Sequence, residues 1–139
     1  MEILSGSMTP RSIARAARWA DGICGFSFGP SIQETETVFQ TARQAWKEVG
    51  RDSEPRLVTS CWFSLEGQGR SQMDAYVRRY LQFAGEAAAA AMAPLATTTS
   101  LEALKGVIRE LRDLGTDELI LVPTTTDVDE VDRIADLIG

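Results

Sequence analysis

The hydrophobic positions along the chain alternate between short apolar runs and longer stretches in which apolar residues recur every three or four positions. The short runs predict strands at 2–4, 23–26, 56–65 and 118–122. The stretches between them predict helices over 10–20, 31–49, 71–93, 101–114 and 127–138. Strands that alternate with helices indicate a parallel sheet with right-handed crossovers, so the pattern predicts an α/β fold with four parallel strands.

Local signals mark where two of the helices begin and where a third ends. Thr9 before Pro10 is typical of an N-cap followed by the first helical residue. Thr99 with Glu102 three residues later predicts a capping box. Gly50 follows a long apolar periodicity and predicts the end of that helix.

Three further features carry specific expectations. The run 118–122 is continuously apolar apart from its first residue, which predicts a strand buried on both faces. Gly85 lies within the stretch 71–93 and is a candidate break in that helix. Gly115 closes the helix that precedes the last strand.

Length and charge restrict the class of protein. A chain of 139 residues fits a single domain over 1–139. The net charge of −6 argues against nucleic acid and anionic membranes as partners, because both require a basic patch. No stretch approaches the ~18 apolar residues of a membrane span, and no secretory signal begins the chain. We therefore expect a protein without nucleic-acid or membrane partners.

Cysteine and histidine usage restrict the chemistry. Cys24 and Cys61 lie in strand-like runs, which predicts two buried reduced thiols and a cytoplasmic protein. The sequence contains no histidine, so an imidazole base from this polypeptide is excluded. Two isolated cysteines do not form a ligand set, and no metal site is predicted. No P-loop, G-x-S-x-G motif or paired carboxylates occur, so no catalytic residue is assigned.

The number of βα units raises the question of architecture. A complete (β/α)8 barrel usually needs about 250 residues. At ~30 residues per βα unit this chain supplies four units. Periodicity alone fits half of such a barrel or a small open doubly wound sheet.

An ordered set of segments resembles the luciferase-like flavin and deazaflavin monooxygenases. The set comprises the strand and loop 3–10, A-A-R-W-A-D-G at 16–22, V-G-R-D at 49–52, the helix–strand pair 104–123 and D-R-I-A at 132–135. The resemblance implies a four-stranded parallel βα half of a (β/α)8 TIM barrel, namely the C-terminal half. It also implies that the cofactor-stacking and catalytic side chains of the first four strands are absent.

The loop after the first strand is the strongest local site. Ser5, Gly6, Ser7, Met8 and Thr9 lead into a helix N-terminus, whose free N–H groups and partial positive charge can hold a phosphate. The resemblance implies that these residues bind the phosphate of FMN or of the deazaflavin coenzyme F420. The alternative is a plain strand–helix turn with an N-cap.

Two further segments follow strands at the face where barrel active sites form. Gly25, Phe26 and Ser27 follow the second strand and are candidates to line a flavin or substrate pocket. The favoured alternative is that Phe26 and Phe28 are packing residues. The hydroxyls of Thr124–Thr126 follow the last strand and either contact a phosphate or substrate or cap the final helix.

A half-barrel exposes two sheet edges and an apolar face, which predicts a homodimer or homo-oligomer, or a separately encoded N-terminal half as partner. The first functional hypothesis is a truncated luciferase-like homologue that binds a flavin or deazaflavin phosphate but lacks catalysis alone. The second is an active flavin- or deazaflavin-dependent oxidoreductase, a monooxygenase by resemblance, assembled as an oligomer or with an N-terminal partner. The third is a non-enzymatic structural or regulatory module.

Overall fold

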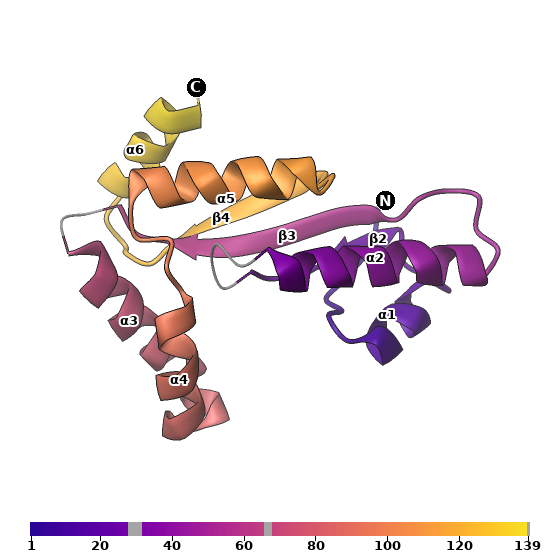
Figure 1. Cartoon of the computed structure of the whole chain (residues 1–139), viewed down its shortest axis with the longest axis horizontal. Helices are drawn as coiled ribbons and strands as arrows, with labels where there is room; N and C mark the ends of the chain where they lie inside the picture. The colour runs from indigo at the N-terminus through magenta and orange to yellow at the C-terminus, as the bar shows by residue number, and fades with distance from the viewer. Residues whose placement is uncertain (28–31, 66–67, 139) are drawn as a thin grey trace. The chain divides into compact units, whose positions relative to one another are not determined.

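The computed structural model describes residues 1–27, 32–65 and 68–138. Four strands form one sheet in the order β1-β2-β3-β4, and helices connect them along the chain (Figure 1). The predicted α/β order of four parallel strands is confirmed. The elements are β1 (Leu4–Ser5), α1 (Pro10–Ala16), β2 (Gly22–Cys24), α2 (Gln33–Glu48), β3 (Arg56–Phe63), α3 (Gly69–Tyr80), η1 (Leu81–Ala84), α4 (Glu86–Met92), η2 (Ala93–Leu95), α5 (Leu101–Asp113), β4 (Glu118–Pro123) and α6 (Asp129–Ile138).

The chain divides into two compact units. The first unit comprises the described residues of 1–27, 32–61 and 109–120. The second comprises those of 62–65, 68–108 and 121–138. The strands β3 and β4 and the helix α5 therefore contribute residues to both units.

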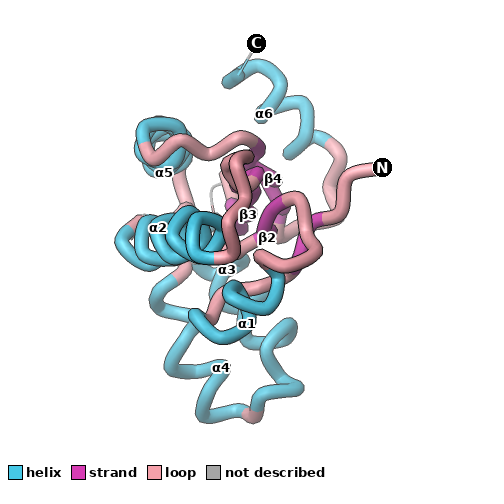
Figure 2. The backbone as a smooth tube through the Cα atoms, turned by 90° about the vertical axis from the view of Figure 1, so that its right-hand side faces the viewer, coloured by secondary structure: helices cyan, strands magenta, loops and turns pink. Residues whose placement is uncertain are grey.

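The core of the first unit lies between its strands and the helices α1 and α2. Leu4 pairs with Gly22 and Ile23 pairs with Leu57, so β1, β2 and β3 run parallel. The helices α1 and α2 are neighbours that lie beside these strands (Figure 2). The apolar residues of α1 and of the turn that follows it are buried in this core: Ile13, Ala16, Ala17 and Ala20.

The ends of α1 are set by side chains from inside and outside the helix. Thr9 is the N-cap as predicted, and it forms a capping box with Ser12. The helix ends at Ala16, before the predicted end at Ala20. The guanidinium of Arg51 donates to the carbonyl oxygens of Ala17 and Ala20, so a loop residue satisfies acceptors that a longer helix would have paired internally.

The second unit has its own small core. Phe63, Leu104 and Ile134 are buried together, with Leu65, Ile108 and Leu121 packed against them. The helices α3 and α4 lie side by side in Figure 1. The predicted break at Gly85 is confirmed, because its φ of 95° lies in the left-handed region and separates η1 from α4.

Two sequence predictions about the last βα unit are wrong. The strand at 118–122 was expected to be buried on both faces, but burial alternates along β4 and Ile120 is 41% exposed. The reason is that β4 is the last strand in the sheet order. The capping hydroxyl of α5 belongs to Ser100, which accepts a hydrogen bond from the Ala103 amide at 3.1 Å, and not to Thr99.

A buried carboxylate holds the segment that follows β3. Glu130 in the first turn of α6 is fully buried, and it accepts a hydrogen bond from the Leu65 amide at 2.6 Å. Its other oxygen lies 3.0 Å from the guanidinium of Arg133, which is half-exposed. Glu130 is therefore the hydrogen-bond acceptor of the Leu65 amide.

We predict that Glu130→Ala lowers the free energy of unfolding by about 2–3 kcal/mol, because the partly buried Leu65 amide loses a buried, charged acceptor. The measurement is chemical denaturation of both variants beside the parent chain. The matched control is Glu102→Ala, which removes an exposed carboxylate from the first turn of α5 and should cost at most about 1 kcal/mol. An equal loss of unfolding free energy in the two variants would contradict the claim that the buried carboxylate of Glu130 stabilises the fold more than an exposed one does.

Both cysteines are free thiols, but the prediction that both are buried is correct only for Cys61, because Cys24 is partly exposed. Cys61 on β3 is fully buried, and this burial raises the pKa of its thiol to about 12. Burial and the negative charge of Glu118 also raise the pKa of Cys24, which is only partly covered. Cys61 should therefore be inert to thiol reagents in the folded chain.

We predict a loss of stability in alkali that depends on Cys61. The folded state keeps the thiol proton up to about pH 12, whereas the unfolded chain loses it above the ordinary value of 9.0. The unfolded state then binds fewer protons, so stability falls by about 1.4 kcal/mol per pH unit between these two values. Urea unfolding across this range should show a shallower fall for Cys61→Ala. Parallel profiles for the two chains would overturn the assignment.

Candidate functional site

The loop between β1 and α1 brings two hydroxyls together at the carboxyl end of β1. The hydroxyl oxygens of Ser5 and Ser7 lie 2.8 Å apart, and the Ser7 amide donates to the Ser5 carbonyl oxygen at 2.8 Å. Ser7 is buried, Met8 is half-buried and Gly6 is exposed. No atom lies within 4 Å of the position that a Cβ on Gly6 would occupy, so this side of the loop is open.

Part of the donor capacity of this loop is used inside the helix cap. The Thr9 hydroxyl accepts from the Ser12 amide at 3.3 Å, and the Thr9 amide donates to the Ser12 hydroxyl at 3.2 Å. Pro10 at the first helical position has no N–H. The hydrogen bond between Ser5 and Ser7 uses one of their two hydroxyl protons, so the other proton is left for a ligand. The exposed backbone at Gly6 is also available. The hydroxyl and the amide of Thr9 are thus engaged in the N-cap of α1.

Gly25, Phe26 and Ser27 continue the pairing of β2 with β3. The Gly25 amide donates to the Val58 carbonyl at 2.8 Å, and the Ser27 amide donates to the Ser60 carbonyl at 2.7 Å. Ser27 is buried and Phe26 is half-buried. The backbone donors of Gly25 and Ser27 are therefore committed to the sheet, and side chains or carbonyls would have to make any ligand contact. Phe28 lies outside the described residues.

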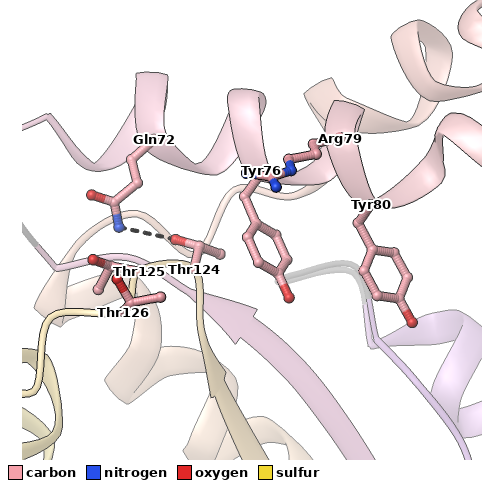
Figure 3. A pocket seen from close by; sticks show the side chains of 7 residues that line it. All are labelled: Gln72, Tyr76, Arg79, Tyr80, Thr124, Thr125 and Thr126. Carbon is pink, nitrogen blue, oxygen red and sulfur yellow. Dashed lines mark hydrogen bonds between the residues drawn. The ribbon is translucent and has the colours of Figure 1, made fainter.

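A cavity of about 540 Å³ lies within the second unit, between α3 and the loop after β4 (Figure 3). This volume is in the range of small-molecule sites. One wall is the threonine loop that the sequence singled out, and the other comes from one side of α3. The lining residues are Gln72, Tyr76, Arg79, Tyr80, Thr124, Thr125 and Thr126.

Hydrogen bonds hold the threonine wall of this cavity. Gln72 donates to the Thr124 hydroxyl at 3.2 Å, and that hydroxyl donates to the Phe63 carbonyl at 3.2 Å (Figure 3). The Thr125 hydroxyl accepts from the Asp127 amide at 3.1 Å, two residues before α6 begins. The first amide of α6, at Asp129, donates to the Asp127 carboxylate at 3.1 Å, so Asp127 and not a threonine caps the final helix. Thr126 is exposed. The loop is thus pinned to the end of β3 while one hydroxyl stays at the surface.

The aromatic side of the cavity continues into a cluster of rings. The centroids of Tyr76 and Tyr80 are 6.1 Å apart, with their planes 15° from parallel. Trp62 meets both rings edge-on, at 5.6 Å from Tyr76 and 5.2 Å from Tyr80. Buried Trp62 therefore fixes the orientation of the two tyrosine rings.

Sequence reasoning found only part of this cavity. Thr124–Thr126 were candidates, whereas Gln72, Tyr76, Arg79 and Tyr80 were not. The 4-residue spacing of the two tyrosines was visible as a stripe on a predicted helix. Gln72, Tyr76 and Tyr80 recur every four residues, and Arg79 lies three residues after Tyr76, so helical spacing is the signal that could have grouped them on one side of α3.

The amino ends of the strands carry a charge cluster of a different kind. Arg56 forms ion pairs with Glu2 and Glu118, and Glu2 makes the largest contribution to the raised pKa of Arg56. Asp21 accepts from the Ile3 amide at 2.7 Å, so its carboxylate fixes β1 and not the end of α1. These contacts pair charges and strand ends with one another, as is typical of the stabilising face of a βα fold.

The described residues allow two further observations. None of their cysteine and acidic side chains gather in groups of three or more that would hold a metal ion. None of the helices among them is long and apolar enough to span a membrane.

Solved structures that align with this fold include two F420-dependent enzymes and a monooxygenase. An F420-dependent secondary alcohol dehydrogenase, in complex with an F420-acetone adduct, aligns over 99% of this chain and 48% of its own, with a TM-score of 0.72 and 13% identity. The coenzyme F420-dependent tetrahydromethanopterin reductase from Methanopyrus kandleri aligns over 98% and 48%, with a TM-score of 0.61 and 13% identity. The monooxygenase RslO1 from Streptomyces bottropensis aligns over 98% and 45%, with a TM-score of 0.61 and 18% identity.

The chain spans about half the length of the solved structures that it matches. No protein-family model and no curated protein matches the sequence. At these identities the likeness concerns the fold, and at that level the predicted resemblance to luciferase-like enzymes is confirmed. The four parallel strands with their helices are half of a (β/α)8 barrel of this type.

Proposed function

We propose that this half-barrel binds the phosphate of a flavin or deazaflavin cofactor through Ser5, Gly6 and Ser7, and that it lacks catalysis alone. The observation that carries the proposal is the open Gly6 beside two hydroxyls that lie 2.8 Å apart. The loop follows the carboxyl end of a parallel strand, which is where barrel enzymes bind phosphates and substrates.

The groups of the loop fit a phosphate. Because no atom lies within 4 Å of the position of a Cβ on Gly6, a ligand oxygen can approach the backbone of this glycine closely. The Ser5–Ser7 pair shares two hydroxyl protons, of which one remains free to donate to an anion. Thr9 contributes indirectly, because its cap fixes the loop relative to α1. At Gly25–Ser27 the amides of Gly25 and Ser27 are committed to the sheet, so side chains or carbonyls would make any contact there.

The cofactor type rests on the structural neighbours. Two of them are F420-dependent enzymes, and a third is a monooxygenase. A bound flavin or deazaflavin supplies the redox chemistry, and the protein supplies binding and orientation. This chain contains no histidine, so proton transfer by an imidazole would have to come from another polypeptide. FMN and F420 are therefore the two cofactors to test.

A location in the cytoplasm is part of the proposal. Cys24 and Cys61 are both free thiols, and a reducing compartment keeps such thiols unpaired. Expression of a fusion to a fluorescent protein, followed by microscopy, tests this part.

We predict that the purified chain binds FMN or F420 saturably, and that Gly6→Val weakens binding at least about tenfold. Valine would fill the open side of the loop without straining the backbone, because Gly6 has no positive φ. Cofactor fluorescence during titration with protein measures the affinity. The control is Gly106→Ala in α5, where an added Cβ also meets no atom within 4 Å.

The outcomes separate the proposed function from its competitors. A chain that binds neither cofactor contradicts the proposal and favours a structural module. Equal binding by Gly6→Val moves the cofactor away from this loop. Turnover of a reduced cofactor by the chain alone contradicts the statement that catalysis is absent, and it favours the active oxidoreductase.

We further propose that a second half-barrel covers β4, either from another copy of the chain or from a separately encoded N-terminal half. The last strand of the sheet is half-exposed, and Ile120 is 41% exposed on it. A long apolar strand at a free edge pairs readily with another strand. Eight strands close such a barrel, and this chain supplies four.

We predict that light scattering of the purified chain gives the mass of a dimer or larger oligomer at micromolar concentration. Ile120→Lys should shift the equilibrium towards monomer, because a lysine on an edge strand opposes strand pairing. Leu95→Lys in η2 is the control, since Leu95 is also exposed but lies outside the sheet. A stable, folded monomer of the parent chain would refute self-association and leave the separate half as the partner to seek.

A further inference from the structure

The arginines of α3 differ in their partners. Arg78 pairs with Asp74 at 2.7 Å within the helix. Arg79, the next residue, lines the cavity of the second unit and forms no ion pair with any residue that the structure describes. A cation beside a cavity without a protein partner is a natural counter-ion for an anionic ligand.

The other lining residues of the cavity indicate what the uncharged part of such a ligand would be. Tyr76 and Tyr80 present aromatic surface, and buried Trp62 holds their rings edge-on. Figure 3 shows Gln72 and Tyr76 extending from α3 towards the side where the threonines lie. The cavity therefore offers an aromatic wall, one cation and a small number of polar groups, which is the composition of small-molecule sites.

The charge around the threonine loop favours a single negative charge on the ligand. Thr126 is followed at once by Asp127, and Asp129 opens α6 two residues later. One guanidinium cannot neutralise a dianionic phosphate beside these carboxylates, but it balances a monoanion. The two parallel N–H groups of a guanidinium also match the two oxygens of a carboxylate.

We propose that the cavity lined by Arg79, Tyr76, Tyr80 and the threonine loop 124–126 is a binding site for a small aromatic carboxylate. Arg79 pairs with the carboxylate, and the tyrosine rings contact the aromatic body of the ligand. The exposed hydroxyl of Thr126 is placed to donate to the same ligand. The site lies wholly in the second unit and does not depend on the cofactor loop of the first.

The test uses the full chain without cofactor and compares 2-naphthoate with its neutral amide, 2-naphthamide. Amide resonances in two-dimensional NMR spectra report binding at Thr124–Thr126 and at the Gln72 side chain. We expect saturable shifts with the carboxylate and at least tenfold weaker binding of the amide, equivalent to ~1.4 kcal/mol. Added sodium chloride should weaken the binding of the carboxylate only.

Neighbouring arginines supply matched variants. Arg79→Gln should weaken binding of 2-naphthoate at least tenfold, whereas Arg78→Gln removes the same charge one residue away and should leave binding unchanged. Arg79→Lys keeps the charge but loses the paired donors, so an intermediate affinity is expected. Gly6→Val should bind 2-naphthoate as the parent chain does, which separates this site from the proposed cofactor loop.

Four outcomes would overturn the proposal. Equal affinity for acid and amide would show an apolar pocket without charge recognition. Equal losses in the two glutamine variants would reduce the effect to net charge. Tighter binding of naphthyl phosphate than of naphthoate would assign the cavity to phosphates. Absence of any shift with the parent chain would refute the site, and should Arg79→Gln not fold, the comparison of acid with amide in the parent chain still decides.

Discussion

The backbone of β3 is the constraint on which both units depend. Gly25 and Ser27 donate to its carbonyls at Val58 and Ser60 in the first unit. Asp117 pairs with both backbone groups of Leu57, at 2.8 Å and 2.9 Å. In the second unit, Thr124 donates to the carbonyl of Phe63. Because neighbouring strands are tied to β3 at these points, the loops that follow them take fixed positions at strand ends.

This constraint explains which parts of the fold were predictable from sequence. Thr9, Gly50, Gly85 and Gly115 mark helix ends through chemistry confined to a few residues, and each acts as predicted. Patterns confined to a few residues do not indicate how many strands lie beside a given strand in the sheet. The apolar run in β4 is typical of a strand in the middle of a sheet. In the structure β4 is last in the strand order and is half-exposed. The misjudged burial therefore reflects the assembly of the sheet and not the propensity of its residues.

The candidate sites were predictable to different degrees for the same reason. The loop 5–9 is continuous in sequence, so its small residues and its cap could be recognised together. Even there, the competition for donors became visible only in the structure, where the Thr9–Ser12 pair uses groups that a phosphate would need. The cavity of the second unit joins α3 to the loop after β4, two segments separated by α4 and α5. No local pattern links Arg79 to Thr126, and Glu130 was overlooked because its partner is the backbone of Leu65.

Charge distribution gives the two sites different chemistry. The loop 5–9, which we propose binds a cofactor phosphate, contains no cationic side chain, so phosphate binding there would rely on hydroxyls, backbone dipoles and an open glycine. The cavity has one guanidinium in a chain of net charge −6, with acidic residues following its threonine wall. A lone cation in negative surroundings favours a ligand of low charge whose remaining surface is apolar. If both proposals hold, the chain would discriminate two anions of different charge and shape with no histidine in its sequence.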